Sequence, residues 1–384
     1  RDVERSRGLG DVYKRQRNGI EGLLEERYID MTEYIKNSMD VEILKRTPSS
    51  FLGSCRFKLP TVEKSPETYE KIIAVLRKFD IQHFFYIGGN DSMDTIKQLS
   101  EYAKAKNITD ITFMGVPKTI DNDLAVTDHT PGYGSAAKYI ASTMKEIIRD
   151  ALVQPIKIVN IIEIMGRNAG WLTAAAALAK GDDCEGADLI YLPETVFDIN
   201  KFVAKVQEIQ KTKKQIVVAV SEGVKTADGK YVCESASSNM LVDSFGHKQL
   251  SGTATALANV ISNEIGCKTR AIEFSTIQRC ASHIASLTDV NEAFIVGGIA
   301  VKAAFDGETG KVGIFQRLSN KPYLMGTSIY DVNAIANVEK TVPQEWIIND
   351  GTGVSQEALD YMRPLIQGEI YPYMVDGLPR HIKL

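Results

Sequence analysis

Two short polar segments of the chain carry residues that could transfer a phosphoryl group. The first is GGNDSMDT, residues 88–95, and the second is PKTIDND, residues 117–123. The first offers two glycines, whose backbone N–H groups can approach an anion closely. The second offers one lysine and two aspartates, which could stabilise developing charge, accept a proton and contact a metal ion.

Each segment follows an apolar run that we expect to form a buried parallel strand. Residues 84–87 (FFYI) precede the first segment, and residues 111–116 (ITFMGV) precede the second. Apolar residues recur at helical spacing over 93–102, so a helix should begin near Asp91. Because ligands of open α/β sheets bind beyond the carboxyl ends of the strands, both segments should lie at one ligand-binding edge. A helix N-terminus there adds partial positive charge.

Either segment alone has a simpler explanation. Gly-Gly turns after strands are common, and Asp or Asn at turns often serves only as a cap. Both segments together, in this order and one strand–helix unit apart, are far more specific. The segments resemble two loops of the phosphofructokinase family: residues 88–92 its GGDGS or GGDDS loop, and residues 117–123 its P-[GK]-TIDND loop. MGR at residues 165–167 resembles its sugar-phosphate loop, and the resemblance extends from about Gly19 to at least Asn291.

The resemblance implies an α/β fold with two Rossmann-like three-layer α/β/α domains and mostly parallel sheets. The alternation of apolar strands and helices along the chain indicates the same class. Further expected strands are residues 156–164, 188–192, 216–220, 269–279 and, at a sheet edge, 311–317. Expected helices are residues 68–79, 135–152, 171–178 and one from about residue 283.

We expect a donor-binding domain made of residues 17–135 and about 280–310. The sugar-phosphate-binding domain should comprise residues 136–279 and about 311–384, which include the C-terminal tail. Residues 1–16 (RDVERSRGLGDVYKRQ) are Arg-rich and without period, and we expect a non-native leader there rather than a basic anion-binding arm. The family's N-terminal strand and GGxxPGxN-type loop, which hold donor phosphates, are not found in the sequence, so we expect part of the donor site to be missing.

Length, charge and cysteine content limit the classes of function. At 384 residues the chain can form two domains. Its formal charge of −4 leaves no basic footprint for nucleic acid, and no apolar run reaches membrane-spanning length. The five cysteines include no CxxC pair, which argues against a disulfide or zinc framework and for a reducing compartment. We therefore expect a cytoplasmic protein without nucleic-acid or membrane partners.

The family resemblance implies transfer of a phosphoryl group to the 1-hydroxyl of fructose 6-phosphate. Asp121 is the expected base, and Lys118 should stabilise the transferred group. Asp123 and Asn90 should contact Mg²⁺, although Asn90 stands where the family usually has an acidic residue and gives a weaker field. The residues expected to bind the donor are Gly88, Gly89, Ser92 and Arg56, the last of which could equally be a solvated loop residue.

Other residues should bind the sugar phosphate. The resemblance implies that Arg167, Arg270 and Arg279 hold the 6-phosphate. Glu222, which could otherwise be a cap, should accept bonds from the sugar hydroxyls. Thr276 stands where ATP-using members have a histidine. The remaining expected substrate-binding residues are Thr119, Ile120, Asp121, Met165 and Gly166. In the family some of these arginines reach across a subunit boundary, which implies a homodimer or homotetramer.

Two positions point to the phosphoryl donor. ATP-using members of the family have glycine where this chain has Asp91 and Lys118, and this pair resembles the pyrophosphate-dependent branch. Asp91 should place bulk and negative charge where a nucleotide α-phosphate would lie, while Lys118 supplies positive charge. The alternatives are an ATP-dependent 6-phosphofructokinase and a non-catalytic phosphofructokinase-like subunit. The presence of Asp121 and Asp123 argues against the second alternative.

Overall fold

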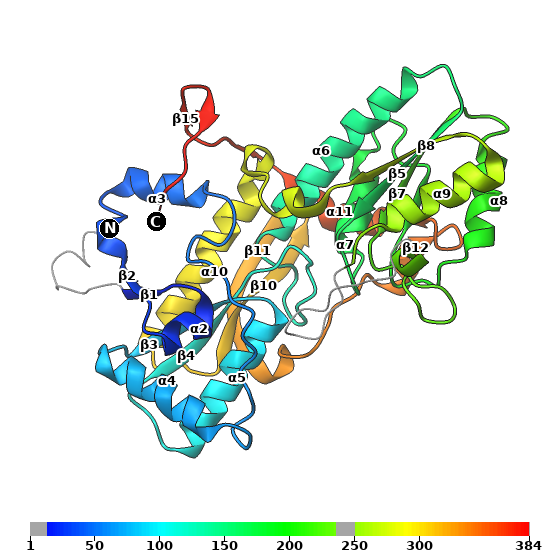
Figure 1. The fold of residues 1–384 in the computed structure, drawn as a ribbon. Coiled ribbons are helices and arrows are strands. Elements are labelled where there is room, and N and C mark those ends of the chain that lie inside the picture. The colour runs from blue at the N-terminus through cyan, green and yellow to red at the C-terminus, as the bar shows by residue number, and fades with distance from the viewer. Residues whose placement is uncertain (1–13, 236–249, 384) are drawn as a thin grey trace.

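The computed structural model describes residues 14–235 and 250–383 (Figure 1). Residues 1–13 of the expected leader lie outside these ranges. Its last three residues form the strand β1 (Lys14–Gln16), which pairs antiparallel with β2 (Tyr28–Asp30). Two four-stranded sheets, each covered by helices on both faces, organise the rest of the chain.

The first sheet has the strand order β11-β10-β4-β3. Its members are β3 (His83–Gly88), β4 (Thr112–Pro117), β10 (Lys311–Asn320) and β11 (Tyr323–Asp331), of which only β11 runs antiparallel to its neighbour. The helices α4 (Pro66–Lys78) and α5 (Asn90–Ala105) bury Leu76 and Met93 against one face. On the other face, α10 (Leu287–Phe305) packs Ala303 and Ala304 against Met114 of β4.

The second sheet is entirely parallel, in the order β6-β7-β5-β8. It consists of β5 (Ile158–Ile164), β6 (Leu189–Tyr191), β7 (Gln215–Ser221) and β8 (Lys268–Glu273). Successive side chains of a strand point to opposite faces. Ile162 and Ile164 accordingly join the core beneath α6 (Tyr133–Leu152), while Val159 and Ile161 join the core beneath α8 (Ile199–Ile209) and α9 (Thr253–Ile265).

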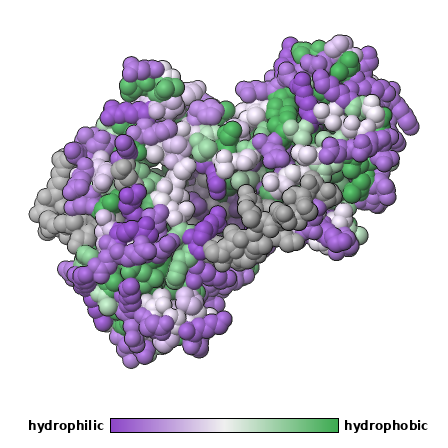
Figure 2. Space-filling model, in the orientation of Figure 1, coloured by the Kyte–Doolittle hydropathy of each residue, from purple (hydrophilic) through white to green (hydrophobic). Residues whose placement is uncertain are grey.

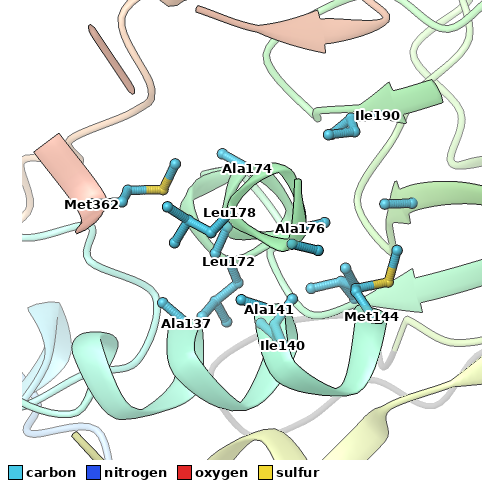
Figure 3. Close-up of a cluster of buried hydrophobic side chains, with 14 of the residues drawn as sticks. Ala137, Ile140, Ala141, Met144, Leu172, Ala174, Ala176, Leu178, Ile190 and Met362 are labelled. Carbon is cyan, nitrogen blue, oxygen red and sulfur yellow. The ribbon is translucent and has the colours of Figure 1, made fainter. Parts of the chain in front are cut away.

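Small residues let a helical segment lie close to α6. The expected helix over 171–178 is α7 (Trp171–Ala174) followed directly by the 3₁₀ turns of Ala175–Ala179. Figure 3 shows Ala137 and Ala141 of α6 facing Leu172 of this segment. Met362, from the end of α11 (Gln356–Met362), closes the same core.

The sequence-based expectations for the main strands and helices are confirmed to within a few residues, with three corrections. The expected strand over 269–279 ends at Glu273, and a 3₁₀ helix, Ser275–Arg279, follows it. Strand β10 is not at an edge but lies between β4 and β11. Residues 311–331 therefore belong to the first sheet and not to the second unit, which the chain rejoins only later, where α11 enters its core.

The remaining elements are short. They are α2 (Gly19–Leu24), α3 (Ser38–Lys45), β9 (Ala285–Ser286), β12 (Ile347–Ile348), β13 (Gly353–Val354), β14 (Glu369–Ile370), β15 (Met374–Val375) and β16 (Leu378–Pro379), together with 3₁₀ turns at Met31–Glu33, Val232–Ser235, Ser282–Ile284, Val332–Ala334, Gln344–Trp346 and Arg363–Ile366. The β15–β16 hairpin returns to α3, where Arg46 Nε donates to the Tyr371 carbonyl at 3.0 Å.

Hydrophilic residues cover most of the face seen in Figure 2, with hydrophobic patches between them. None of the helices in the described ranges combines the length and the apolar character needed to cross a membrane.

Candidate active site

The first glycine segment lies between β3 and the N-terminus of α5, as expected. The Gly88 carbonyl accepts a 3.0 Å hydrogen bond from the Lys118 backbone N–H, so the ends of β3 and β4 are joined at this edge. A Cβ atom on Gly88 would lie 2.0 Å from Ser92 Oγ, which leaves no room for a larger residue. The α5 N-terminus and Lys118 therefore lie next to each other, where an anion can interact with both.

Residues 118–131, which we call the aspartate loop, follow β4 and lead into α6. Thr119 Oγ1 accepts a 3.1 Å hydrogen bond from the Asp121 N–H and lies 3.3 Å from Asp121 Oδ2, to which it donates. Thr119 also forms a parallel bridge with Gly132 at the start of α6. Local bonds thus fix the position of the Asp121 carboxylate.

The charges of the aspartate loop are strongly coupled. The Lys118 side chain reaches solvent, yet partial burial lowers the pKa of its ammonium group; Asp121 opposes this effect, and Arg279 adds to it. Burial raises the pKa of Asp121, whereas Thr119, Lys118 and Arg167 act to lower it. A carboxylate with a raised pKa is a better proton acceptor near neutral pH.

Asp123 and Asn90 are neighbours in the structure, since the Asn90 side chain hydrogen-bonds to the Asp123 carboxyl and acts to lower its pKa. Burial, followed by the nearby Asp121 and Glu339 charges, raises the pKa of Asp123 to about 6. Asn90 Nδ2 donates to the Val338 carbonyl at 3.3 Å. Asp123 Oδ1 and Asn90 Oδ1 are both buried and accept no hydrogen bond from the described residues. Buried oxygens without donors fit a hard cation such as Mg²⁺.

The MGR segment begins what we call the arginine loop, residues 165–170, after β5. Gly166 has a φ of 141°, a conformation that favours glycine, and its N–H lies 3.4 Å from Glu222 Oε1. Gly223 is equally constrained, because a Cβ there would lie 1.9 Å from the Arg167 carbonyl oxygen. The Met165 N–H donates to Gln278 Oε1 at 3.1 Å, which brings the segment with Arg279 to the same edge.

Glu222 lies within the electrostatic influence of Asp121 and Arg167. Burial raises its pKa to about 7, with smaller raising effects from Glu163 and Asp121, while the Gly166 N–H and Arg167 act against them. Arg167 acts on Asp121, and Arg279 acts on Lys118. The arginine loop, Glu222 and Arg279 therefore lie within electrostatic range of the aspartate loop, and we call the region between them the cleft.

Arg270 is held away from this cleft, whereas Thr276 and Arg56 are exposed in segments that border the site. Arg270 forms an exposed 3.2 Å ion pair with Asp150, near the C-terminal end of α6. At a rise of 1.5 Å per residue, Asp150 lies about 25 Å from the start of α6, which is the end that lies beside Thr119. Thr276 is exposed in the 3₁₀ helix that ends at Arg279. Arg56 is exposed in a loop whose neighbours Cys55 and Phe57 line a pocket with Asp91 and Ser92.

Sequence reasoning missed a third wall of the site. The segment after β11 brings Glu339 into an antiparallel bridge with Leu124, next to Asp123, and Asn168 Nδ2 donates to Glu339 Oε1 at 3.0 Å. Lys340 follows, and its N–H donates to the Asp123 carbonyl at 2.7 Å. No local sequence motif marks this segment. It comes to the site only because the chain passes between the two sheets here, which is a feature of the tertiary structure.

The fold is α/β, and the site brings carboxylate and cationic side chains from several segments of the chain together. Sequence comparison agrees. The profile of the family described as Phosphofructokinase matches residues 7–275, a match that begins inside the expected leader. This chain belongs to the phosphofructokinase family.

Curated relatives and a solved structure are similar over most of the chain. The pyrophosphate–fructose 6-phosphate 1-phosphotransferase of Halomonas elongata is 39% identical over 98% of this chain and 88% of its own length. The protein of the same name from Xanthomonas campestris is 41% identical over 96% of this chain and 87% of its own. The crystal structure of the pyrophosphate-dependent phosphofructokinase from Nitrosospira multiformis superposes with a TM-score of 0.87 at 36% identity, covering 99% of this chain and 89% of that one.

Proposed function

We propose that this chain transfers a phosphoryl group from pyrophosphate to the 1-hydroxyl of fructose 6-phosphate. The observation that carries the proposal is the placement of Lys118, which lies in the electrostatic reach of Asp121 and Asp123 and of Arg279. A cation between a base and an anion-binding arginine is the arrangement that in-line phosphoryl transfer needs. The two relatives named above carry this activity in their names.

The reaction needs one proton transfer and one displacement. The Asp121 carboxylate accepts the proton of the 1-hydroxyl, whose oxygen forms a bond to one phosphorus of pyrophosphate. The bridging P–O bond breaks, and inorganic phosphate leaves with the bond electrons. Lys118 stabilises the charge on the transferred group, and Thr119 holds the base in position.

Asp123 and Asn90 would hold Mg²⁺ through their unpartnered buried oxygens. When bound, the ion neutralises negative charge on the pyrophosphate. Among the described residues no three His, Cys, Asp or Glu side chains form a metal-binding cluster. That fits Mg²⁺, which commonly uses one or two carboxylates together with substrate phosphates and water.

Fructose 6-phosphate is assigned to the second wall of the cleft. Arg167 and Arg279 bind the 6-phosphate, and Glu222 accepts bonds from sugar hydroxyls. Residues that shape this subsite are Thr119, Ile120, Met165 and Gly166. Arg270, which its ion pair with Asp150 holds away from the cleft, serves the site of a second copy in a homodimer or homotetramer, and Thr276 supports the subsite from the 3₁₀ helix that carries Arg279.

A face of α10 is suited to such an assembly. Phe294 and Phe305 are 61% and 71% exposed, and a Cβ atom on Gly297 or Gly298 would meet nothing within 4 Å. Contiguous exposed apolar side chains commonly mark protein–protein contacts.

The donor assignment rests on the first turn of α5. Asp91 is exposed there and shares a pocket with Ser92, Cys55 and Tyr86. Its charge opposes a nucleotide α-phosphate at this place, whereas pyrophosphate needs only Gly88, Gly89, Ser92, Lys118 and Arg56. The described cysteines are all free, which supports a cytoplasmic location. Phosphorylation of fructose 6-phosphate would give the protein its role in glycolysis.

The test compares donors. Fructose 1,6-bisphosphate formation is measured with Mg²⁺ and either pyrophosphate or ATP, for the wild-type chain and for Asp121→Asn. We expect turnover with pyrophosphate only, and its loss in the variant by a factor of about 10²–10⁴, the usual contribution of a general base. Turnover with ATP only would support the ATP-dependent alternative. Binding of fructose 6-phosphate without turnover of either donor would support the non-catalytic one.

A further inference from the structure

Lys340 contacts the aspartate loop from the far side of the cleft. We propose that Lys340 is a positioning residue, which holds this loop in the conformation that presents Asp121 and Asp123. The proposal rests on the proposed function and deepens it. It concerns a residue that follows β11 and lies more than 200 positions after the loop in sequence.

The backbone of Lys340 joins the two walls of the site. Its N–H donates to the Asp123 carbonyl at 2.7 Å, on the side of the aspartate loop. Its carbonyl accepts a 2.9 Å bond from Trp171 Nε1, and Trp171 begins α7 directly after the arginine loop. Two residues further on, the Val342 N–H donates to Glu194 Oε1, which also accepts from the Gly170 N–H. Movement of either loop is therefore opposed by the same segment.

The ammonium group of Lys340 is satisfied by the aspartate loop. Nζ donates to the Asp128 carbonyl at 2.7 Å and to the Thr127 carbonyl at 3.2 Å, and it lies 3.5 Å from Asn122 Oδ1. A lysine has three N–H donors, so each has an acceptor on this loop. The Trp171 ring covers the group, with its centroid 5.2 Å from Nζ.

Asn122 conveys this contact to the two aspartates that flank it. It is fully buried and has a φ of 55°, in the left-handed region. Its Oδ1 also accepts a 3.0 Å bond from the Thr130 N–H, and its Nδ2 donates to the Tyr361 hydroxyl at 2.8 Å. A non-glycine residue remains in this conformation only where surrounding bonds hold it. Because the Asn122 side chain is held in the interior, the backbone positions of its neighbours Asp121 and Asp123 are held as well.

Removal of the positive charge of Lys340 should therefore disturb the conformation of the aspartate loop before other parts of the site. Methionine at this position would fill the space with an apolar chain of similar length. It would also leave the Thr127 carbonyl without the Lys340 donor, which is costly for a buried group, while the Asp128 carbonyl would keep the Tyr361 hydroxyl as its donor.

The experiment compares Lys340→Met with Lys138→Met. Lys138 is a matched control, because it too is largely buried and donates to a carbonyl, that of Gly368 at 2.6 Å, and to a carboxylate, that of Glu369 at 2.8 Å. For a folded Lys340→Met we expect kcat to fall about 100-fold, the loss associated with misplacement of reacting groups by about 1 Å. The KM values for both substrates should stay within about threefold of wild type, because the binding residues are retained.

A folded Lys340→Met whose kcat stays within about threefold of wild type overturns the proposal. If that variant does not fold, Trp171→Phe decides, since it removes the donor to the Lys340 carbonyl and reduces the ring that covers the Lys340 ammonium group. A lower kcat at an unchanged melting temperature supports the proposal, and an unchanged kcat overturns it. Hydrogen exchange of the backbone amides of residues 118–131 gives a second readout, which does not depend on turnover. Faster exchange there in Lys340→Met than in Lys138→Met supports the proposal even if wild type uses neither donor, and equal exchange overturns it.

Discussion

The side-chain oxygen Oε1 of Gln278 accepts a 3.1 Å hydrogen bond from the backbone N–H of Met165. Gln278 is 3% exposed, and its Nε2 donates to the Ser275 carbonyl at 3.0 Å. This one side chain therefore sets the distance between the arginine loop and the 3₁₀ helix that ends at Arg279. The two arginines assigned to the 6-phosphate depend on it for their spacing.

Gln278→Ala should weaken binding of fructose 6-phosphate. Loss of the side chain leaves the Met165 N–H unsatisfied, at a cost of about 1–3 kcal/mol, and we expect the KM for fructose 6-phosphate to rise roughly tenfold while the KM for pyrophosphate changes little. Steady-state kinetics with each substrate varied in turn checks this. Gln210→Ala is the control, since Gln210 is also buried but lies at the end of α8. An equal rise in both KM values would contradict the assignment.

The double variant Asp91→Gly, Lys118→Gly should shift donor use toward ATP. It removes the charge that opposes a nucleotide α-phosphate, an effect of several kcal/mol, so the ratio of kcat/KM for ATP to that for pyrophosphate should rise by roughly 100-fold or more. Glu101→Gly, an exposed position further along α5, makes the same type of change away from this pocket and should leave the ratio unaltered. A ratio that does not move in the double variant would show that these residues do not determine the donor.

Glu163 should make stability depend on pH. Burial raises its pKa to about 7, although Glu163 Oε2 accepts a 2.9 Å bond from the Ala254 N–H at the start of α9. A carboxyl whose folded pKa lies above its unfolded value of 4.5 loses stabilising free energy as pH rises from 4.5 to 7, by about 1.4 kcal/mol for each unit of pKa difference that is traversed. Below 4.5 both states are protonated, and above 7 the loss is complete.

Glu163→Gln removes this titration. The melting temperature of the variant relative to wild type should therefore increase between pH 5 and pH 7.5, as measured by circular dichroism. Glu264→Gln, an exposed residue on α9, serves as the control and should show no such trend. A constant difference between Glu163→Gln and wild type across this pH range would refute the prediction.

Arg270 should act in the site of a second copy. Arg270→Ala and Asp121→Asn should each be nearly inactive alone. Equal amounts of the two, dissociated and reassembled together, should recover about a quarter of wild-type activity, because half of the resulting dimers are mixed and each mixed dimer has one intact site. Mixing without dissociation is the control. Failure to recover activity in an assembly proved to be mixed would place Arg270 outside the site.

Much of the fold follows from local patterns in the sequence. The continuous apolar runs before Gly88 and Lys118 predict buried parallel strands, and the structure confirms them as β3 and β4. The short pattern KVGIFQR begins with a lysine and ends with two polar residues, and we expect an edge strand there. In the structure it is the inner strand β10, because the hairpin partner β11 shields it. Sequence periodicity reports how a strand is buried but not which sheet it joins.

The site was predictable where chemistry is concentrated in one segment. Lys118, Thr119 and Asp121 lie on one loop, so their proximity follows from the chain itself. Lys340 and Gln278 carry no such signal, because their roles depend on contacts with residues more than 100 positions away. Arg270 shows the opposite case. The family resemblance predicts an arginine at this position in the site, but strand β8 places it away from the cleft of its own chain.

The interleaved path of the chain has a consequence for dissection of the protein. Residues before β5 supply α6 to the core of the second sheet, while β10 and β11 return to complete the first. The chain then goes back, and α11 fills the second core. No single break in the chain separates two pieces that each contain a complete sheet and core, so neither half can be expressed or exchanged as an independent domain. Destabilising substitutions in about the last hundred residues should therefore affect both sheets.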